Sequence, residues 1–217
     1  MLFLKILVID QLKNTLIFGS LSFRGIVKVV KGKYKNTPLF VPPHTRVPSL
    51  RVKKSLFDMV GEYIEKSEIL DLFSGSGSLG IEALSLGAKK VFFVDIRKKA
   101  VQFTLKNLSL IKALSYAEVF LKDVFKAIKD FFAQKYKFDV IFLDPPYYKG
   151  ISLKTLQTLD EYDILAPQGL IVVLCYYKER MREEFSHFII FKEKFYGDTQ
   201  LKIYSRKDEK GGLSRYI

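Results

Sequence analysis

The 217-residue sequence contains a single cysteine, Cys175, and only two histidines. One cysteine cannot form an internal disulfide bond, and no Cys/His cluster offers the ligand spacing of a zinc site. Cys175 lies in the apolar run LIVVLCYY, which favours a small buried side chain over a reactive nucleophile. The sequence therefore excludes a disulfide-stabilised domain, predicts no metal site and favours the reducing cytoplasm.

Long hydrophobic runs are also missing. Lys5, Asp10 and Lys13 interrupt the apolar N-terminal stretch, so no segment of it reaches the length of a membrane span. The same stretch lacks the small-residue cleavage site that follows a secretory signal. We expect residues 1–26 to be a leader of unknown role, and we expect no membrane partner.

Acidic residues are absent from residues 24–54, which contain nine lysines and arginines. The whole chain has 36 Lys+Arg against 23 Asp+Glu, a formal net charge of +13. A surplus of this sign favours a polyanionic partner, with nucleic acid ahead of an anionic membrane surface. Hydrophobic residues make up 48% of the chain, so a packed core is expected and bulk disorder is not.

Strand-like and helix-like segments alternate through most of the chain. Apolar composition predicts buried strands at EILDLF, VFFVD, AEVFL, FDVIFL and GLIVVLCYY. Helical spacing separates these strands, and a short helix is also predicted over residues 178–185, KERMREEF. Repeated βα units predict an α/β fold with a parallel sheet covered on both faces, and the final segments HFIIFKEKF and QLKIYSR predict an antiparallel hairpin.

A basic segment precedes these units. GIVKVV and PLFV flank the turn KGKYKNT, which predicts a β-hairpin, and the prolines that follow exclude a helix until about Leu50. We therefore expect three parts: the leader, a basic hairpin with a proline-rich docking segment over residues 27–48, and an α/β domain over residues 49–217.

The first predicted strand runs into LDLFSGSGSLG, where Gly75, Gly77 and Gly80 have the G-x-G-x-x-G spacing. Glycines at a strand-to-helix turn permit a tight bend and let a ligand approach the backbone closely. Asp95 ends the next strand, where a carboxylate can accept from both ribose hydroxyls of a cofactor. The pattern alone suits NAD, FAD or S-adenosylmethionine, and glycines that only pack a tight turn are the alternative.

Two further carboxylates favour S-adenosylmethionine. Asp71 precedes the glycine loop, where it suits a cationic ligand and would repel a pyrophosphate. Asp123 follows the third strand, where it can accept from an adenine amino group or simply cap the next helix. The predicted cofactor site comprises Asp71, Phe73, Ser74, Gly75, Gly77, Asp95, Ile96, Asp123 and Val124.

The fourth predicted strand ends in D-P-P-Y, at Asp144, Pro145, Pro146 and Tyr147. The lone pair of an exocyclic base amine is delocalised into the ring, so this amine is a poor nucleophile until acceptors hold and orient it. The Asp144 carboxylate and the Pro145 carbonyl supply two acceptors, and Tyr147 offers a face for a stacked base. We predict that these four residues catalyse methyl transfer to a base amine; a rigid turn that ends the strand is the alternative.

The motif holds an amine and does not identify the base. Methylation of DNA at adenine N6 or cytosine N4 uses the same chemistry. A nicotinamide oxidoreductase is supported only by the glycine spacing, and a non-catalytic RNA-binding assembly factor is a third class. The residues predicted to contact nucleic acid are Lys31, Lys33, Tyr34, Lys35, Arg46, Arg51, Lys53 and Lys54, and a solvated basic hairpin is the alternative.

The stretches SGSGSLGIEALSLGA, LDPPY and RVKKSLF resemble the bacterial small-subunit ribosomal RNA guanine-N2 methyltransferases, the RsmD-like family. The resemblance covers the chain from about Val27 to Arg206. It implies a Rossmann-like class I methyltransferase sheet, mostly parallel and seven-stranded, with an antiparallel C-terminal hairpin. It also implies S-adenosylmethionine as the methyl donor. The implied acceptor is a guanine of 16S rRNA, nucleotide 966 in the name of the family's activity, in the assembling 30S subunit.

One segment departs from that family. The usual R-P-T-x-D-R-V-[KR]-E corresponds here to residues 46–54, where Leu50 and Lys54 replace an aspartate and a glutamate. The departure leaves the transfer chemistry intact and bears on how RNA docks. We expect the protein to act as a monomer.

Overall fold

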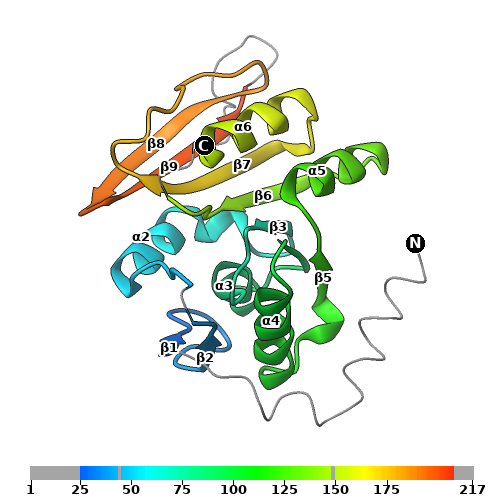
Figure 1. The fold of residues 1–217 in the computed structure, drawn as a ribbon, viewed down its shortest axis with the longest axis vertical. Coiled ribbons are helices and arrows are strands. Elements are labelled where there is room, and N and C mark those ends of the chain that lie inside the picture. The colour runs from blue at the N-terminus through cyan, green and yellow to red at the C-terminus, as the bar shows by residue number, and fades with distance from the viewer. Residues whose placement is uncertain (1–24, 44, 148–149, 208–217) are drawn as a thin grey trace.

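The computed structural model describes residues 25–43, 45–147 and 150–207, so nearly all of the predicted leader lies outside the described residues. One seven-stranded sheet has the order β5-β4-β3-β6-β7-β9-β8 (Figure 1). Its strands are β3 (Glu68–Leu72), β4 (Lys90–Asp95), β5 (Ala117–Leu121), β6 (Phe138–Leu143), β7 (Leu165–Tyr176), β8 (Phe188–Tyr196) and β9 (Thr199–Arg206). The helices are α2 (Leu50–Val60), α3 (Ser78–Ser85), α4 (Lys98–Leu110), α5 (Val124–Ala133) and α6 (Ile151–Glu161), with short 3-10 turns at Gly61–Tyr63 and Leu114–Tyr116.

The strands β3 to β7 run parallel to one another, and β9 lies antiparallel between β7 and β8. The predicted α/β class, the parallel βα units and the antiparallel C-terminal hairpin are therefore confirmed. The change of direction along the sheet, from β4 on one side of β3 to β6 on the other, creates the crevice in which α/β sheets bind their ligands.

Side chains of each strand alternate between two cores. Val91 and Phe93 of β4 face a core shared with α2, α3 and α4, while Phe92 and Val94 face a core shared with α5 and α6. Cys175 is buried in the second core, as predicted, and this burial raises the pKa of its thiol to about 12. A thiol of this kind is not a nucleophile at neutral pH.

The predicted N-terminal hairpin forms a separate two-stranded antiparallel sheet of β1 (Gly25–Lys28) and β2 (Pro38–Val41). Asn107 of α4 acts as a strand partner for it: the Asn107 Oδ1 accepts from the Phe40 N–H, and the Nδ2 donates to the Phe40 carbonyl, each at 2.9 Å. The same Nδ2 donates to the Ser76 carbonyl at 2.9 Å. Asn107 thereby ties the hairpin to the glycine loop.

A buried ion pair fastens the hairpin from its other side. Lys53 Nζ lies 3.0 Å from Glu82 Oε2 and donates to the Lys28 carbonyl at 2.9 Å, and both charged side chains are fully buried. Glu82 also accepts from the backbone N–H groups of Val30 and Lys31. The prediction that Lys53 contacts nucleic acid is wrong, because this side chain points into the core and pairs with Glu82.

Gly32, in the turn of the hairpin, lies directly against α3. Its φ is +75°, and a Cβ at this position would lie 1.9 Å from the Ser85 carbonyl oxygen. We expect Gly32→Ala to lower the free energy of unfolding by more than the roughly 1–2 kcal/mol that a left-handed backbone alone costs an alanine, because the hairpin must also move away from α3.

Gly197→Ala is the matched control for that substitution. Gly197 has a φ of +56°, but no atom lies within 4 Å of its would-be Cβ, so only the conformational cost applies. Urea unfolding of both variants measures the difference. Equal losses of stability would show that Gly32 does not make the close approach to Ser85.

The prediction of a short helix over residues 178–185 is wrong. The chain between Tyr176 and Phe188 forms turns and one isolated bridge. Met181 and Phe185 have the four-residue spacing of a helix face, but Phe185 packs its ring against Phe188, with centroids 4.7 Å apart. Contacts with the sheet therefore override the local helical pattern.

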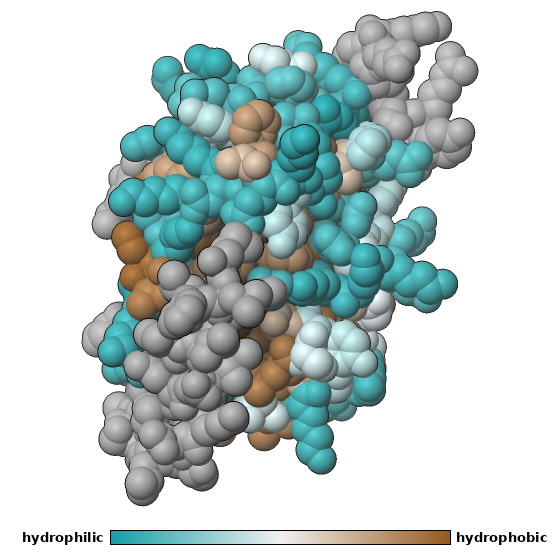
Figure 2. Space-filling model, turned by 90° about the vertical axis from the view of Figure 1, so that its right-hand side faces the viewer, coloured by the Kyte–Doolittle hydropathy of each residue, from teal (hydrophilic) through white to brown (hydrophobic). Residues whose placement is uncertain are grey.

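The side of the molecule near the edge strand β5 is mostly hydrophilic, with hydrophobic side chains between the polar ones (Figure 2). Within the described residues, no helix is long and apolar enough to cross a membrane, and no group of His, Cys, Asp or Glu side chains could hold a metal ion. The exposed hydrophobic residues along this edge are Leu110, Leu114, Tyr116 and Leu121, and single exposures of this kind are ordinary for a protein surface.

Candidate active site

A cleft of about 530 Å³ lies at the carboxyl ends of the parallel strands. It is lined by all four predicted catalytic residues, and its size is that of a small-molecule site. Of the predicted cofactor residues, Gly77 alone does not line it; it is the N-cap of α3. The others line it: Asp71, Phe73, Ser74, Gly75, Asp95, Ile96, Asp123 and Val124.

Each of the three glycines in the glycine loop occupies a position where a side chain would be strained or would clash. Gly75 and Gly77 have φ values of +59° and +76°, which favour glycine, and a Cβ on Gly80 would lie 2.3 Å from the Phe93 ring. Phe73 also has a positive φ, +64°, although a bulky residue pays about 1–2 kcal/mol for it. Strained backbone conformations persist only where the surrounding structure holds them, and they are common at functional sites.

Asp71 is a buried acid at the base of the cleft. It is 2% exposed, and its Oδ2 accepts from the Gly80 N–H at 2.9 Å. Burial raises the pKa of Asp71 to about 8, and the charges of Asp144 and Asp95 act in the same direction. A cation beside Asp71 would lower this pKa again and ionise the group.

Two buried hydroxyls of the cleft, Ser74 Oγ and Thr45 Oγ1, make no hydrogen bond within the described residues. Buried polar atoms in proteins are normally hydrogen-bonded, so an orphan pair in one cleft needs an explanation. Polar atoms of a ligand would supply the missing partners. Together with the acid at Asp71, these hydroxyls fit a small polar cation.

Asp95 lies at the end of β4, as predicted, but its oxygens already have partners. Oδ1 accepts from the Arg97 backbone N–H and Nε at 2.9 and 3.2 Å, and Oδ2 accepts from the Gly75 N–H and Arg97 Nη2 at 2.9 and 3.1 Å. A carboxylate has about four acceptor positions, so these contacts fill them. The half-exposed Arg97 guanidinium must move before Asp95 can accept from a ribose.

Asp123 begins α5 and lines the cleft. Its Oδ1 accepts from the Lys126 N–H at 3.1 Å, so the predicted helix cap is confirmed. One cap bond leaves the other carboxylate oxygen as a further acceptor in a residue that lines the cleft. The cap and a contact with a ligand are therefore compatible.

Asp144 follows β6 and lies in the same cleft as the glycine loop. Burial raises the pKa of Asp144 to about 6, and the Arg46 guanidinium opposes this rise. Arg46 Nη1 donates to Asp144 Oδ1 at 2.6 Å. Asp144 is therefore mostly ionised at neutral pH and acts as an acceptor.

The Tyr147 ring forms the wall of the cleft beside Asp144. Its hydroxyl donates to Thr199 Oγ1 of β9 at 3.0 Å, and Arg46 lies over its face, with Cζ 3.6 Å from the ring centroid. Arg46 Nη2 also donates to Thr199 Oγ1 at 3.1 Å and to the Tyr147 hydroxyl. The C-terminal hairpin thus helps to hold the aromatic ring.

The residues predicted to contact nucleic acid occupy different places. Arg46 lines the cleft, whereas Lys33, Lys35, Arg51 and Lys54 are exposed on the hairpin and α2. The remaining three have partners inside the protein, and one of them is Lys53, which pairs with Glu82. Lys31 pairs with Asp58 of α2 at 2.5 Å, and Tyr34 is half-buried against the first core.

The residues at the site that were not predicted include three with polar side chains, Thr45, Arg97 and Thr199. Arg97 follows Asp95 by two residues, a local signal that could have been noticed. Thr45 lies in the proline-rich segment before α2, where the pattern indicates only an extended chain. Thr199 is 52 residues beyond Tyr147, and no local pattern connects the two.

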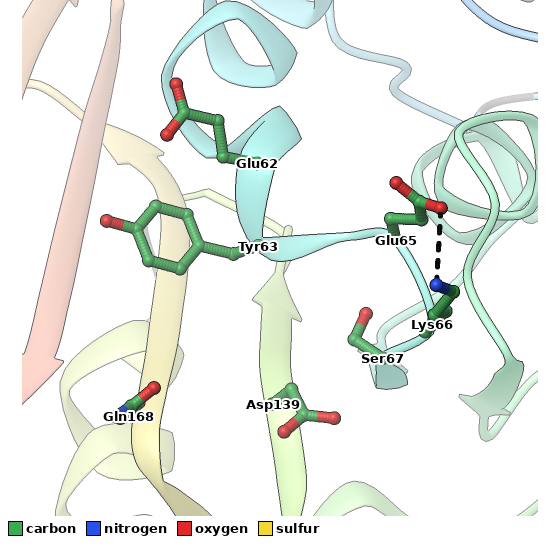
Figure 3. A pocket seen from close by; sticks show the side chains of 7 residues that line it. All are labelled: Glu62, Tyr63, Glu65, Lys66, Ser67, Asp139 and Gln168. Atoms are coloured by element: carbon green, nitrogen blue, oxygen red, sulfur yellow. Dashed lines mark ion pairs between the residues drawn. The ribbon is translucent and has the colours of Figure 1, made fainter. Parts of the chain in front are cut away.

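A second hollow, of about 280 Å³, lies at the amino ends of the strands (Figure 3). Its only close charge pair among the residues drawn is the exposed Glu65–Lys66 pair at 4.0 Å. Ligands of parallel sheets bind at the opposite, carboxyl ends, so this hollow is not a candidate active site. Its lining consists of Glu62, Tyr63, Glu65, Lys66, Ser67, Asp139 and Gln168.

The chain is similar to known proteins over most of its length. "Putative rRNA methyltransferase YlbH" of Bacillus subtilis is 36% identical over 184 residues, covering 83% of this chain and 100% of the relative. "Ribosomal RNA small subunit methyltransferase D" of Haemophilus influenzae is 35% identical, covering 83% and 94%. The solved structure of "Putative methyltransferase yhhF" from Escherichia coli aligns with a TM-score of 0.74 at 28% identity, covering 84% of this chain and 98% of that one.

A sequence model of one protein family, described as "Conserved hypothetical protein 95", matches residues 27–205. This range includes the hairpin, the glycine loop, D-P-P-Y and the C-terminal hairpin. The match and the identities above confirm the resemblance drawn from the motifs. The chain therefore belongs to this family, that of the RsmD-like small-subunit ribosomal RNA methyltransferases.

Proposed function

We propose that this protein transfers a methyl group from S-adenosylmethionine to the N2 amine of a guanine in 16S rRNA, during assembly of the small subunit in the cytoplasm. The observation that carries the proposal is the single cleft that D-P-P-Y shares with the glycine loop. The names of the relatives support rRNA as the substrate. The N2 atom and the nucleotide, guanine 966 in the family's usage, are part of the proposal.

The acceptor amine is held by the D-P-P-Y corner. The Asp144 carboxylate, ionised at neutral pH, accepts one N–H of the amine, and the Pro145 carbonyl accepts the other. Both prolines lack an N–H and fix φ, so the corner is stiff, and Tyr147 stacks on the base. As the amine gains the methyl group it becomes cationic, and Asp144 stabilises it and takes its proton directly or through water.

The opposite wall of the cleft holds the cofactor. S-adenosylmethionine, when bound, supplies an electrophilic methyl carbon. Asp71 carries the charge that pairs with a cationic ligand, Asp95 accepts from the ribose once Arg97 has moved, and Asp123 accepts from the adenine amino group. Ile96, which is 65% exposed at the end of β4, offers an apolar face to the adenine ring. Ser74 Oγ gains the partner that it lacks within the protein.

The exposed cations of the hairpin and of α2 bind the RNA backbone. Lys33, Lys35, Arg51 and Lys54 neutralise phosphates without reading the sequence, so they place the RNA while the cleft selects the base. Binding is expected to weaken steeply with salt for the same reason.

The test offers labelled S-adenosylmethionine with separate acceptors: undermethylated 30S particles, naked 16S rRNA and DNA. Mass spectrometry of the digested nucleosides is expected to show N2-methylguanosine in the 30S reaction. Label that appears only in DNA, or only as N6-methyladenosine or N4-methylcytidine, contradicts the proposal. No transfer to any acceptor would favour a non-catalytic RNA-binding factor.

The cofactor assignment has a separate test in proton release. Because the pKa of Asp71 is about 8, the acid is mostly protonated at pH 7, and a bound cation is expected to displace up to about one proton. Calorimetry of S-adenosylmethionine binding in two buffers with different ionisation enthalpies measures this number. Asp71→Asn is expected to abolish the release, and an equal release from that variant would contradict the assignment.

A further inference from the structure

The guanidinium of Arg46 lies where the acceptor base would have to lie. It covers the Tyr147 ring, with Cζ 3.6 Å from the centroid, and it donates to Asp144 Oδ1 at 2.6 Å. These are the aromatic face and the carboxylate that the proposed reaction needs for the base. A base cannot stack on Tyr147 and donate to Asp144 while Arg46 occupies both.

The chemistry of the occupant is close to that of guanine. A guanidinium is planar and only donates hydrogen bonds. The N1–C2–N2 edge of guanine has the same planar carbon bonded to nitrogens, and its N1–H and N2–H₂ groups are all donors. Adenine differs, because its N1, beside the amino group, is an acceptor. Acceptors surround Arg46 here: Asp144 Oδ1, Thr199 Oγ1 and the Tyr147 hydroxyl.

We propose that Arg46 holds the place of the acceptor guanine in the free protein and gives it up to the base when RNA docks, moving its guanidinium onto an RNA phosphate. This inference rests on the proposed function. It explains why an arginine of the RNA-docking segment has its head in the cleft while the neighbouring Arg51 lies on the surface.

The position of Arg46 permits this exchange. Its side chain is 35% exposed, and it lies in the segment between β2 and α2, a few residues before the exposed Arg51 that is proposed to bind a phosphate. A guanidinium binds phosphate with two parallel hydrogen bonds, so an RNA phosphate can replace the carboxylate of Asp144 as its anionic partner. A free nucleoside brings no phosphate and offers no such replacement. Arg46 thereby favours guanines that arrive within RNA over free guanosine.

The size of the effect follows from the population of the open state. If Arg46 leaves the cleft in at most about 10% of free molecules, the apparent affinity for guanosine is reduced by about tenfold or more. Removing the side chain is expected to restore that affinity. The same removal is expected to weaken binding of rRNA, because the protein then has one cation fewer to pair with a phosphate.

Calorimetry of guanosine binding, with S-adenosylhomocysteine present, tests the inference on the full chain. Arg46→Ala is expected to bind guanosine about tenfold or more tightly than the wild type, with a smaller gain for adenosine. Arg46→Lys is also expected to bind guanosine more tightly than the wild type. An ammonium is not planar and lacks the fork of donors, so it occupies the place of the base less well. Arg182→Ala is the matched control, since Arg182 is exposed and does not line the cleft, and it is expected to leave guanosine affinity unchanged.

Guanosine binding by Arg46→Ala that is unmeasurable, or no tighter than that of the wild type, overturns the inference. An equal gain for adenosine overturns it too, because the likeness to guanine would then have no effect. Methylation of 30S particles by the wild type, measured in parallel, separates the two claims. If the wild type methylates guanine N2 but Arg46→Ala shows no gain in guanosine affinity, only the inference about Arg46 is overturned. If the wild type does not methylate guanine N2, the proposed function is overturned.

Discussion

Asp144→Asn is expected to reduce methyl transfer by about a hundredfold to ten-thousandfold, the range in which a positioned acid–base group acts. Asparagine has nearly the same shape as aspartate, but it is neutral and cannot take a proton from the methylated amine. The loss should fall on kcat, with RNA affinity nearly intact, because the phosphate contacts are unchanged. Single-turnover transfer to 30S particles measures the rate of the chemical step.

Asp139→Asn is the matched control, since Asp139 lies at the other end of the same strand and accepts from the Glu68 N–H at 2.8 Å. An amide oxygen can still accept there, so activity should stay near the wild-type level. Transfer by Asp144→Asn at the wild-type rate would remove Asp144 from the mechanism.

The pH dependence of the wild type gives a second measurement on Asp144. Since burial raises its pKa to about 6, kcat/KM should fall as the pH drops below about 6 and the carboxyl becomes protonated. Stability changes with pH in the opposite direction. Because burial raises the pKa of Asp144 from 3.8 to about 6, the free energy of unfolding is expected to fall as the pH rises through this range. Asp144→Asn is therefore not expected to unfold more easily than the wild type at pH 7, so a loss of activity is not a loss of fold.

Lys53→Met is expected to lower the free energy of unfolding by about 3–5 kcal/mol, because it leaves the fully buried Glu82 charge without its partner. At about 2–4 °C per kcal/mol for a chain of this size, the melting temperature should fall by roughly 6–20 °C. Thermal unfolding followed by circular dichroism measures the change. The pKa of Lys53 is lowered by burial and sustained by Glu82, so the ammonium depends on that one carboxylate.

Lys54→Met is the control for this prediction. Lys54 is the next residue along the chain and is exposed, so removing its charge should change stability by no more than about 0.5 kcal/mol. The two lysines should also differ in function. Lys54→Met should weaken RNA binding and make that binding less dependent on salt. Equal melting temperatures for the two variants would mean that Lys53 is not the buried partner of Glu82.

The acidic residues of the cleft could be predicted from the sequence because each lies at or near the end of a predicted strand. Asp71 and Asp95 lie at the ends of segments that are apolar enough to be buried strands, and Asp123 and Asp144 follow such segments. The carboxyl ends of parallel strands meet at one edge of the sheet, so sequence spacing alone brings these acids together. The glycine spacing then indicates which of them lie beside the cofactor.

The contacts between distant segments could not be predicted in this way. Arg46 meets Asp144 across 98 residues and Thr199 across 153, and only the folded sheet brings them together. The basic neighbours of Lys53 predict a surface position for it, which the structure corrects. A better signal lies in α3, where Glu82 is the one charged residue of a helix that is buried throughout, and a buried acid requires a cation.

The last described strand, β9, has a consequence for when the enzyme becomes active during its own synthesis. β9 inserts between β7 and β8, and its first residue, Thr199, bonds the Tyr147 hydroxyl. A nascent chain that has emerged only as far as β8 lacks both the central neighbour of β7 and the clamp on that tyrosine. We therefore expect the D-P-P-Y side of the cleft to be complete only after β9 has been synthesised and has paired with β7.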